Sequence, residues 1–198
     1  MTAVRSLCGR IILIKSGQLA GDGLPDEIIQ AYVSHGFQEL LQRKWDALSA
    51  GKSLAKNGLY LKEARIDLDS ASEGIIRVDT PFTLSFCVQS EREVTVNLSP
   101  HYSLIGGEVI FNAPSPQHEL RPGNNWFVCS MPANLLNDGV YSVQVMIVSD
   151  STPIQVVNDA LVFEVHDLPR NGAWYGKWPG VVRPLLEWNF SRQSTETI

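Results

Sequence analysis

The residues of this sequence that could do chemistry are its histidines, cysteines and carboxylates, and their spacing does not build a catalytic centre. The histidines are scattered and predict solvated or singly hydrogen-bonded rings, not metal ligands; they are His35, His101, His118 and His166. Asp67 and Asp69 lie two apart on an expected strand and share one face, usually the solvent side of a sheet. A phosphate loop, HExxH, GxSxG and Cys-x-x-Cys are absent from the sequence. We therefore expect no catalytic residue, no metal and no cofactor.

Composition limits the class of protein. The 198 residues, 44% of them hydrophobic, can bury one main core, and a formal net charge of -5 offers no basic surface for nucleic acid. The cysteines Cys8, Cys87 and Cys129 are odd in number and lie in apolar strand-like runs, which predicts reduced buried thiols and a cytosolic protein. The sequence has no signal-peptide pattern and no run of about 20 apolar residues, so we expect no membrane span.

The first part of the chain predicts a hairpin followed by a helix. Residues 10–21 (RIILIKSGQLAG) form two short apolar runs around a Ser-Gly turn. After Pro25, apolar residues recur every three or four positions, which predicts one face of a helix over 25–48: Ile29, Val33, Phe37, Leu41, Trp45 and Leu48. The polar, glycine-containing stretch 49–58 is typical of a linker, so we expect one unit over 1–57 and another over 58–198.

The second part of the chain predicts strands only. Short β-type runs with turn residues between them lie at 59–69, 74–78, 82–89, 93–99, 108–112, 125–131, 140–149, 160–166 and 181–188. Many short strands without a helix between them favour an all-β fold. We expect an antiparallel β-sandwich of the immunoglobulin-like or jelly-roll type.

Alternation along three of these strands separates core from surface. The inward positions predict a core of Leu84, Phe86, Val88, Val94, Val96, Leu98, Tyr141, Val143, Val145 and Ile147. The outward positions carry Ser85, Asn97, Ser99, Ser142 and Gln144, which would form one polar platform if the strands are adjacent. A plain solvent-facing sheet is the alternative interpretation. Trp126, His101 and Tyr102 could add an aromatic edge, although a strand tryptophan is more often a core residue.

Three stretches of the sequence carry two resemblances to known families. Leu7 to Tyr32 (LCGRIILIKSGQLAGDGLPDEIIQAY) is similar to the closing segment of ABC-transporter ATPase subunits, with Gly9 at a position where that pattern usually has an acidic residue. The stretches MPANLLNDGVYSV and PGVVRPLLEW resemble the C-terminal extension of the Wzt-type ATPase subunits, which export O-antigen and related polysaccharides. Together the two resemblances cover nearly the whole chain.

The resemblance implies a function in recognition. In the Wzt-type family this extension is a β-sandwich that binds the exported glycan, often at its non-reducing end, and works as a dimer. The resemblance therefore implies a fragment of a longer subunit, without ATPase activity of its own. It also implies a polysaccharide ligand, a membrane-spanning permease partner and a cytoplasmic location at the inner face of the bacterial inner membrane. The expected glycan-binding residues are Ser85, Asn97, Ser99, His101, Trp126, Ser142 and Gln144.

The sequence leaves two other functions open, and it also predicts how the subunits assemble. The sandwich could instead dock a glycan-terminating enzyme on the transporter, or be a stand-alone carbohydrate-active enzyme. The C-terminal segment WYGKWPGVVRPLLEWNF combines aromatic residues with Pro184, which cannot donate a ladder hydrogen bond. We expect a homodimer in which the strand at 181–188 lies at or across the subunit boundary.

Overall fold

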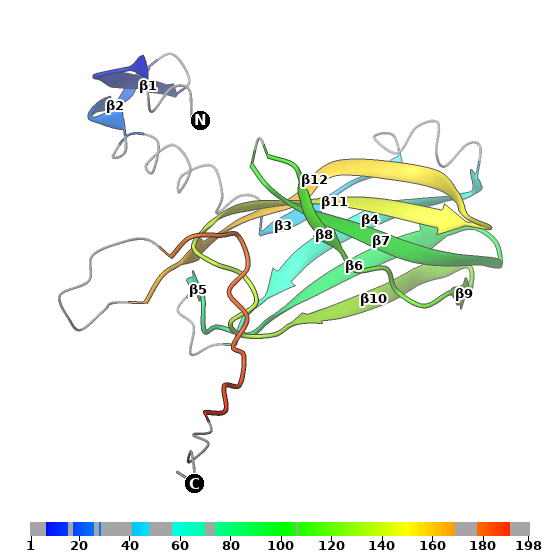
Figure 1. The fold of residues 1–198 in the computed structure, drawn as a ribbon. Coiled ribbons are helices and arrows are strands. Elements are labelled where there is room, and N and C mark those ends of the chain that lie inside the picture. The colour runs from blue at the N-terminus through cyan, green and yellow to red at the C-terminus, as the bar shows by residue number, and fades with distance from the viewer. Residues whose placement is uncertain are drawn as a thin grey trace, which may run out of the picture.

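The fold is a β-sandwich with a two-stranded hairpin beside it (Figure 1). The computed structural model describes residues 7–15, 18–25, 28, 41–47, 57–69, 74–105, 107–168 and 178–190. Almost all the regular structure in these ranges is strand, which confirms the all-β sandwich expected from the sequence. No helix in the described ranges has the length and apolar character needed to cross a membrane.

The N-terminal hairpin forms as the sequence predicts. Strand β1 (Ile11–Lys15) pairs antiparallel with β2 (Gln18–Gly23). A Cβ at Gly21 would lie 3.1 Å from Cδ1 of Ile28, so a larger residue at this position would require the Ile28 side chain to shift. Ile28 is buried, and its backbone N–H donates to the Leu24 carbonyl at 3.1 Å.

The helix expected over 25–48 is wrong at its C-terminal end. Residues Gln42–Lys44 form a strand, β3, which pairs antiparallel with Glu63–Arg65. Leu41 and Trp45 flank this strand and pack against the sandwich core, so their spacing of four reflects two strand ends and not one helix face. Most of the remaining residues of that range lie outside the described part of the chain. The division at residue 57 stays a prediction, but residues 41–45 pack with the sandwich.

The first layer of the sandwich is a four-stranded antiparallel sheet. Its order is β10 (Gly123–Met131), β6 (Phe82–Ser90), β4 (Leu59–Asp67) and β3. Strand β10 is therefore an edge strand, and β6 separates it from β4.

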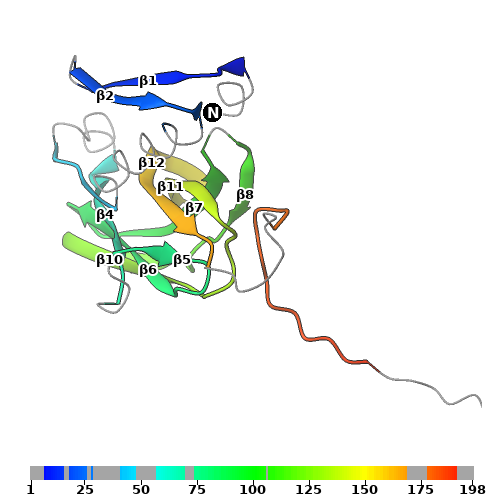
Figure 2. The same ribbon diagram turned by 90° about the vertical axis from the view of Figure 1, so that its left-hand side faces the viewer.

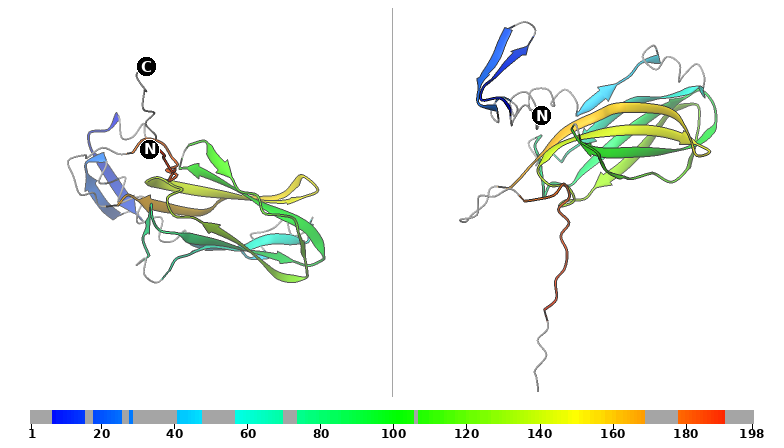
Figure 3. Two further views of the ribbon diagram at one scale, coloured as in Figure 1. Left: turned by 60° about the horizontal axis from the view of Figure 1, so that its bottom comes forward. Right: turned by 45° about the horizontal axis from the view of Figure 1, so that its top comes forward.

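The second layer is a mixed six-stranded sheet. The order is β5 (Ile76–Arg77), β12 (Thr152–His166), β11 (Gly139–Ser149), β7 (Val94–Leu104) and β8 (Val109–Asn112), and β9 (His118–Leu120) also pairs with β7. Only the pair β5 and β12 is parallel among these strands. Figure 2 and Figure 3 show the two layers face to face.

The core between the layers is the one that alternation predicts. All ten expected core residues pack there, with Val94 half-buried and the other nine buried. Aromatic rings from both layers meet near one end, where Phe163 contacts Phe82 edge-on and stacks on Tyr141. The predicted alternation is therefore confirmed for strands β6, β7 and β11.

The C-terminal segment does not form the strand expected at 181–188. Within the described residues its pairing is a single bridge between Val182 and Leu136, and the chain then extends away from the sandwich (Figure 1). The buried Asn137 amide holds the start of this segment by donating to the carbonyls of Trp178 and Gly180, each at 2.8 Å. A strand needs a neighbour for its backbone groups, and beyond this bridge none of the described strands provides one.

The cysteines differ from the prediction at one position. Cys87 is buried and Cys129 is half-buried, but Cys8 is exposed, and all three thiols are free. Cys8 precedes the hairpin, which buries little apolar surface of its own. Burial raises the pKa of the Cys87 thiol, so this cysteine is in its neutral form.

Candidate functional site

The seven predicted site residues lie on two opposite faces of the sandwich. Asn97, Ser99, His101, Ser142 and Gln144 lie on the outer face of the six-stranded sheet, and we keep the name platform for these five residues. Ser85 and Trp126 lie on the outer face of the four-stranded sheet. The assumed adjacency of 82–89 with 93–99 and 140–148 is therefore wrong, because β6 belongs to the other layer.

The platform is gathered by the pairing of β7 with β11. Gln144 lies opposite His101, and the Ser99 hydroxyl is 3.2 Å from the His101 ring. Ser99 and Ser142 are only 8% and 9% exposed, so their hydroxyls present little surface to a ligand. The neutral polar groups predicted from alternation are present, but two of the five are buried.

A β-bulge in β12 accepts hydrogen bonds from two residues of the platform. Val143 pairs with Leu161 and Val145 with Val157, so Asn158 and Asp159 are part of an insertion opposite Gln144. Asp159 adopts a left-handed backbone with φ 48 and accepts a hydrogen bond from the Ser142 hydroxyl. The Gln144 amide donates to the Asn158 side chain at 2.6 Å. Two of the five platform residues thus already donate to side chains of the bulge.

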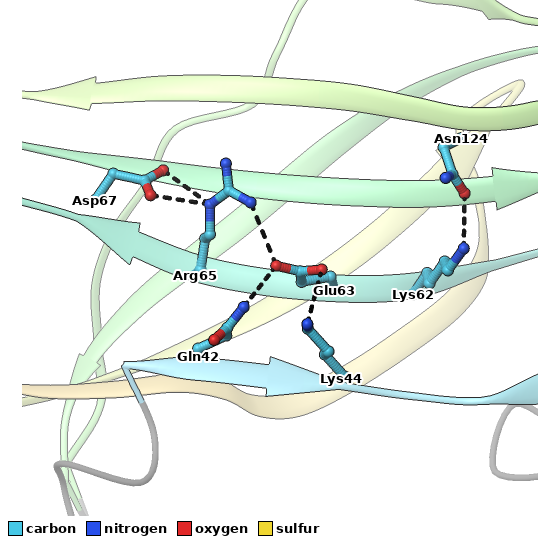
Figure 4. A network of polar contacts seen from close by, with 7 residues as sticks. All are labelled: Gln42, Lys44, Lys62, Glu63, Arg65, Asp67 and Asn124. Carbon is cyan, nitrogen blue, oxygen red and sulfur yellow. Dashed lines mark hydrogen bonds and ion pairs between the residues drawn. The ribbon is translucent and has the colours of Figure 1, made fainter.

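The opposite face carries a charged network around one aromatic ring. We define the Trp126 face as the outward residues Gln42 and Lys44 of β3, Lys62, Glu63, Arg65 and Asp67 of β4, Ser85 of β6, and Asn124 and Trp126 of β10. Figure 4 shows seven of these side chains and the contacts between them. A bulge in β4 between Leu61 and Glu63 adds Lys62 to the outward set, because its extra residue shifts the alternation.

Arg65 is the centre of this network. Its Nε donates to both carboxylate oxygens of Asp67, at 2.9 and 3.2 Å, and its guanidinium carbon lies 4.6 Å from the centre of the Trp126 ring. Burial disfavours the charged form, but the contacts with Asp67 and Glu63 outweigh it and raise the pKa of the Arg65 guanidinium. Arg65 is therefore a fixed cation that is held between a carboxylate and an indole.

Two further contacts orient the polar groups beside the ring. The buried Ser85 hydroxyl donates to the second oxygen of Asp67 at 2.6 Å. Lys62 donates to the Asn124 side-chain oxygen at 3.0 Å, which links β4 to the edge strand β10. The carboxylate of Asp67 is still about half-exposed, with 45% of its side-chain surface open. Its exposed surface can accept hydrogen bonds from a ligand, and its orientation is already set by Arg65 and Ser85.

Trp126 gives the face its apolar surface. The side chain is 45% exposed, and Val128, two residues along the same strand, is 66% exposed. An exposed indole beside an oriented carboxylate and a guanidinium fits a sugar ring, whose apolar side can stack while its hydroxyls bind the polar groups.

A cleft runs along β10 next to this face. We call it the edge cleft: it has a volume of about 910 Å³ and lies between residues 124–130 of β10 and the segment 113–120. Trp126 and Asn124 line it as well as belonging to the Trp126 face, so the two features are continuous.

Sequence reasoning missed most of the Trp126 face. Arg65, Lys62 and Asn124 were not predicted as site residues, and Asp67 was interpreted only as part of a solvated strand. One signal could have found three residues of the Trp126 face: the charged side chains of Glu63, Arg65 and Asp67 recur at every second position, on one face of a strand. The described residues hold no group of three or more His, Cys, Asp or Glu that could bind a metal ion.

Comparison with known proteins identifies the fold. No protein-family model and no curated protein matches the chain. The structure is similar to that of the C-terminal domain of Wzt, with TM-score 0.54 and 16% identity, over 70% of this chain and 86% of that chain. The likeness is one of fold. The β-D-mannosidase from Dictyoglomus thermophilum also matches, with TM-score 0.40 and 9% identity, over 72% of this chain and 20% of that chain.

Proposed function

We propose that the chain is a non-catalytic carbohydrate-binding module that binds an O-antigen-like polysaccharide through the Trp126 face. The observation that carries this proposal is the half-exposed indole of Trp126, which stacks with Arg65 and is linked through Arg65 to the oriented Asp67 carboxylate. Sugar hydroxyls that replace water at the Arg65 and Asp67 side chains stabilise the complex only modestly. Apolar contact of the sugar ring with the indole adds to this stabilisation.

The glycan would be bound for export and not for cleavage. The likeness to the C-terminal domain of Wzt and the sequence resemblance support a place in an ABC exporter, with a permease as partner, at the cytoplasmic side of the inner membrane. Binding of the polysaccharide end would then select the chain that is exported. Within this proposal Ser85 has a supporting role, since it orients Asp67 without contacting the glycan.

The exposed C-terminal segment supports a homodimer. Leu185, Leu186, Trp188 and Phe190 are 68–90% exposed in an extended chain. Monomeric proteins rarely expose so much contiguous apolar surface. The second copy would cover this segment, either by simple packing or by exchange of the segment between subunits.

Calorimetric titration of the full chain with the O-polysaccharide of its source organism tests the proposal, with an unrelated polysaccharide as control. We expect saturable binding of the first and none of the second, and no stabilisation of the chain by ATP in a thermal melt. Capture of a glycan-terminating enzyme without any binding of polysaccharide would contradict the proposal and favour the protein-docking alternative.

A further inference from the structure

We propose that the edge cleft is a second subsite, which binds the sugar units next to the one stacked on Trp126, so that the module reads a short stretch of chain. This inference rests on the proposed glycan-binding function and adds the length of glycan that is recognised. It starts from the position of β10, which ends the strand order of the four-stranded sheet and leaves one side of this strand without a described neighbour.

The volume of the cleft suits an oligosaccharide. Pockets that enclose drug-sized ligands have volumes of roughly 300–1,000 Å³, and the edge cleft, at about 910 Å³, lies at the upper end of this range. One sugar on the Trp126 ring would leave this space unused. A chain that continues past Asn124 and Trp126 would enter it directly, because both residues border the two features.

The cleft has an apolar interior and a polar rim. Its inner part is formed by the core side chains Phe86, Leu98, Leu120 and Phe127. Its rim carries exposed polar side chains, His118, Glu119, Asn124 and Ser130. Sugar rings have apolar faces and hydroxyl edges, so this lining fits a glycan better than it fits a purely apolar ligand.

The wall formed by 113–120 is fixed by hydrogen bonds. The backbone N–H of Ala113 donates to the Pro100 carbonyl, and that of Ser115 donates to the Leu98 carbonyl at 2.8 Å. The Ser115 hydroxyl in turn accepts from the Leu98 N–H at 3.0 Å and donates to the Pro116 carbonyl at 2.8 Å. This segment is therefore anchored to β7.

The opposite wall is fixed at the start of β10. The Asn125 amide donates to the Arg121 and Gly123 carbonyls, at 2.8 and 3.1 Å, and its oxygen accepts from the Arg121 N–H at 3.1 Å. The His118 ring also packs edge-on against Phe127, with ring centres 5.5 Å apart, which joins the two walls. Because both walls are held by hydrogen bonds within the chain, little ordering is needed when a glycan binds.

The test is the dependence of affinity on glycan length. The source O-polysaccharide is partially hydrolysed, separated by size into oligosaccharides from one sugar unit upward, and titrated into the full chain. We expect the affinity to rise at least about tenfold between one unit and the length that fills the cleft, about 1.4 kcal/mol.

Two matched variants locate the effect. Ser130→Tyr places a large side chain at an exposed position of the cleft, and Thr152→Tyr places the same side chain at an exposed position of β12, which does not line the cleft. We expect the affinity of Ser130→Tyr for one sugar unit to be unchanged and its increase in affinity with glycan length to be lost. Thr152→Tyr should behave as the unchanged chain.

Three outcomes would overturn the inference. If the affinity is already full with one sugar unit, the cleft contributes nothing, while the glycan-binding proposal stands. If Ser130→Tyr keeps the gain with length, the additional units bind elsewhere. If no oligosaccharide and no polysaccharide binds the unchanged chain, the proposed function and this inference both fail.

Discussion

The two outer faces of the sandwich both carry polar groups but use them differently. On the platform, Ser142 and Gln144 donate to side chains of the β12 bulge, Asp159 and Asn158. On the Trp126 face, the internal contacts orient Arg65 and Asp67 beside a half-exposed ring. Polar composition alone does not make a binding surface, because the polar groups must be oriented and still exposed.

The largest effect is expected from removing the ring. Trp126→Ala should weaken binding of the source polysaccharide by roughly thirtyfold, about 2 kcal/mol, because the apolar contact and the partner of Arg65 are both lost. Titration calorimetry measures this change. His101→Ala on the platform is the control and should change the affinity less than about twofold; equal losses in the two variants would remove the distinction between the faces.

A matched pair of buried serines tests the difference between the Trp126 face and the platform. Ser85 donates to Asp67 on one face and Ser142 donates to Asp159 on the other. Each change to alanine should cost about 1 kcal/mol of unfolding free energy in urea, the usual contribution of one hydrogen bond. Only Ser85→Ala should also weaken glycan binding, by roughly threefold to tenfold, since Asp67 loses its orientation. Weakening by Ser142→Ala alone would move the site to the platform.

Smaller effects are expected from the accessible amides of the platform. Asn97→Ala and Gln144→Ala should each change the affinity less than about twofold, because the Gln144 amide already has the Asn158 side chain as partner and both lie far from Trp126 in the sandwich. The same titration gives the result. A tenfold loss in either variant would place the glycan on the platform.

The smallest effect on affinity is expected from removing the C-terminal segment. A chain that ends at Arg183 keeps the pairing of Arg183 with Asp167 and the contacts of Asn137 with Trp178 and Gly180. It should be a monomer by light scattering, with unchanged affinity per chain, because the exposed apolar residues after Arg183 belong to neither face. A stable dimer would place the subunit contact elsewhere, and a lost affinity would show that the second copy completes the site.

The alternation of side chains made much of the fold predictable. The period of two along β6, β7 and β11 identified the core residues, because apolar side chains occupy the inward positions and mostly polar ones the outward positions of each strand. The three-residue strand β3 could not be identified in this way, because Gln42–Lys44 has no apolar residue and its pairing depends on β4. The segment 181–188 had the composition of a strand but has no partner strand among the described residues.

The candidate site was only partly predictable, because it depends on which strands share a layer. The sequence gives the parity of Ser85 and Ser142 but not the sheet to which each strand belongs, so residues of opposite faces were combined. Bulges added a second difficulty. They place Lys62 on the Trp126 face and Asp159 against Ser142, and neither shift can be derived from a regular alternation.

A nuclear magnetic resonance titration of the ¹⁵N-labelled chain with the source polysaccharide tests most directly whether the glycan binds the Trp126 face. The Trp126 indole N–H signal is assigned by its loss in Trp126→Phe, and the side-chain signals of Arg65 and Gln144 by the corresponding variants. We predict that the Trp126 and Arg65 signals shift together and saturate, while the Gln144 amide signal stays in place. A saturable shift of Gln144 with unchanged Trp126 and Arg65 signals would contradict the assignment of the glycan to the Trp126 face.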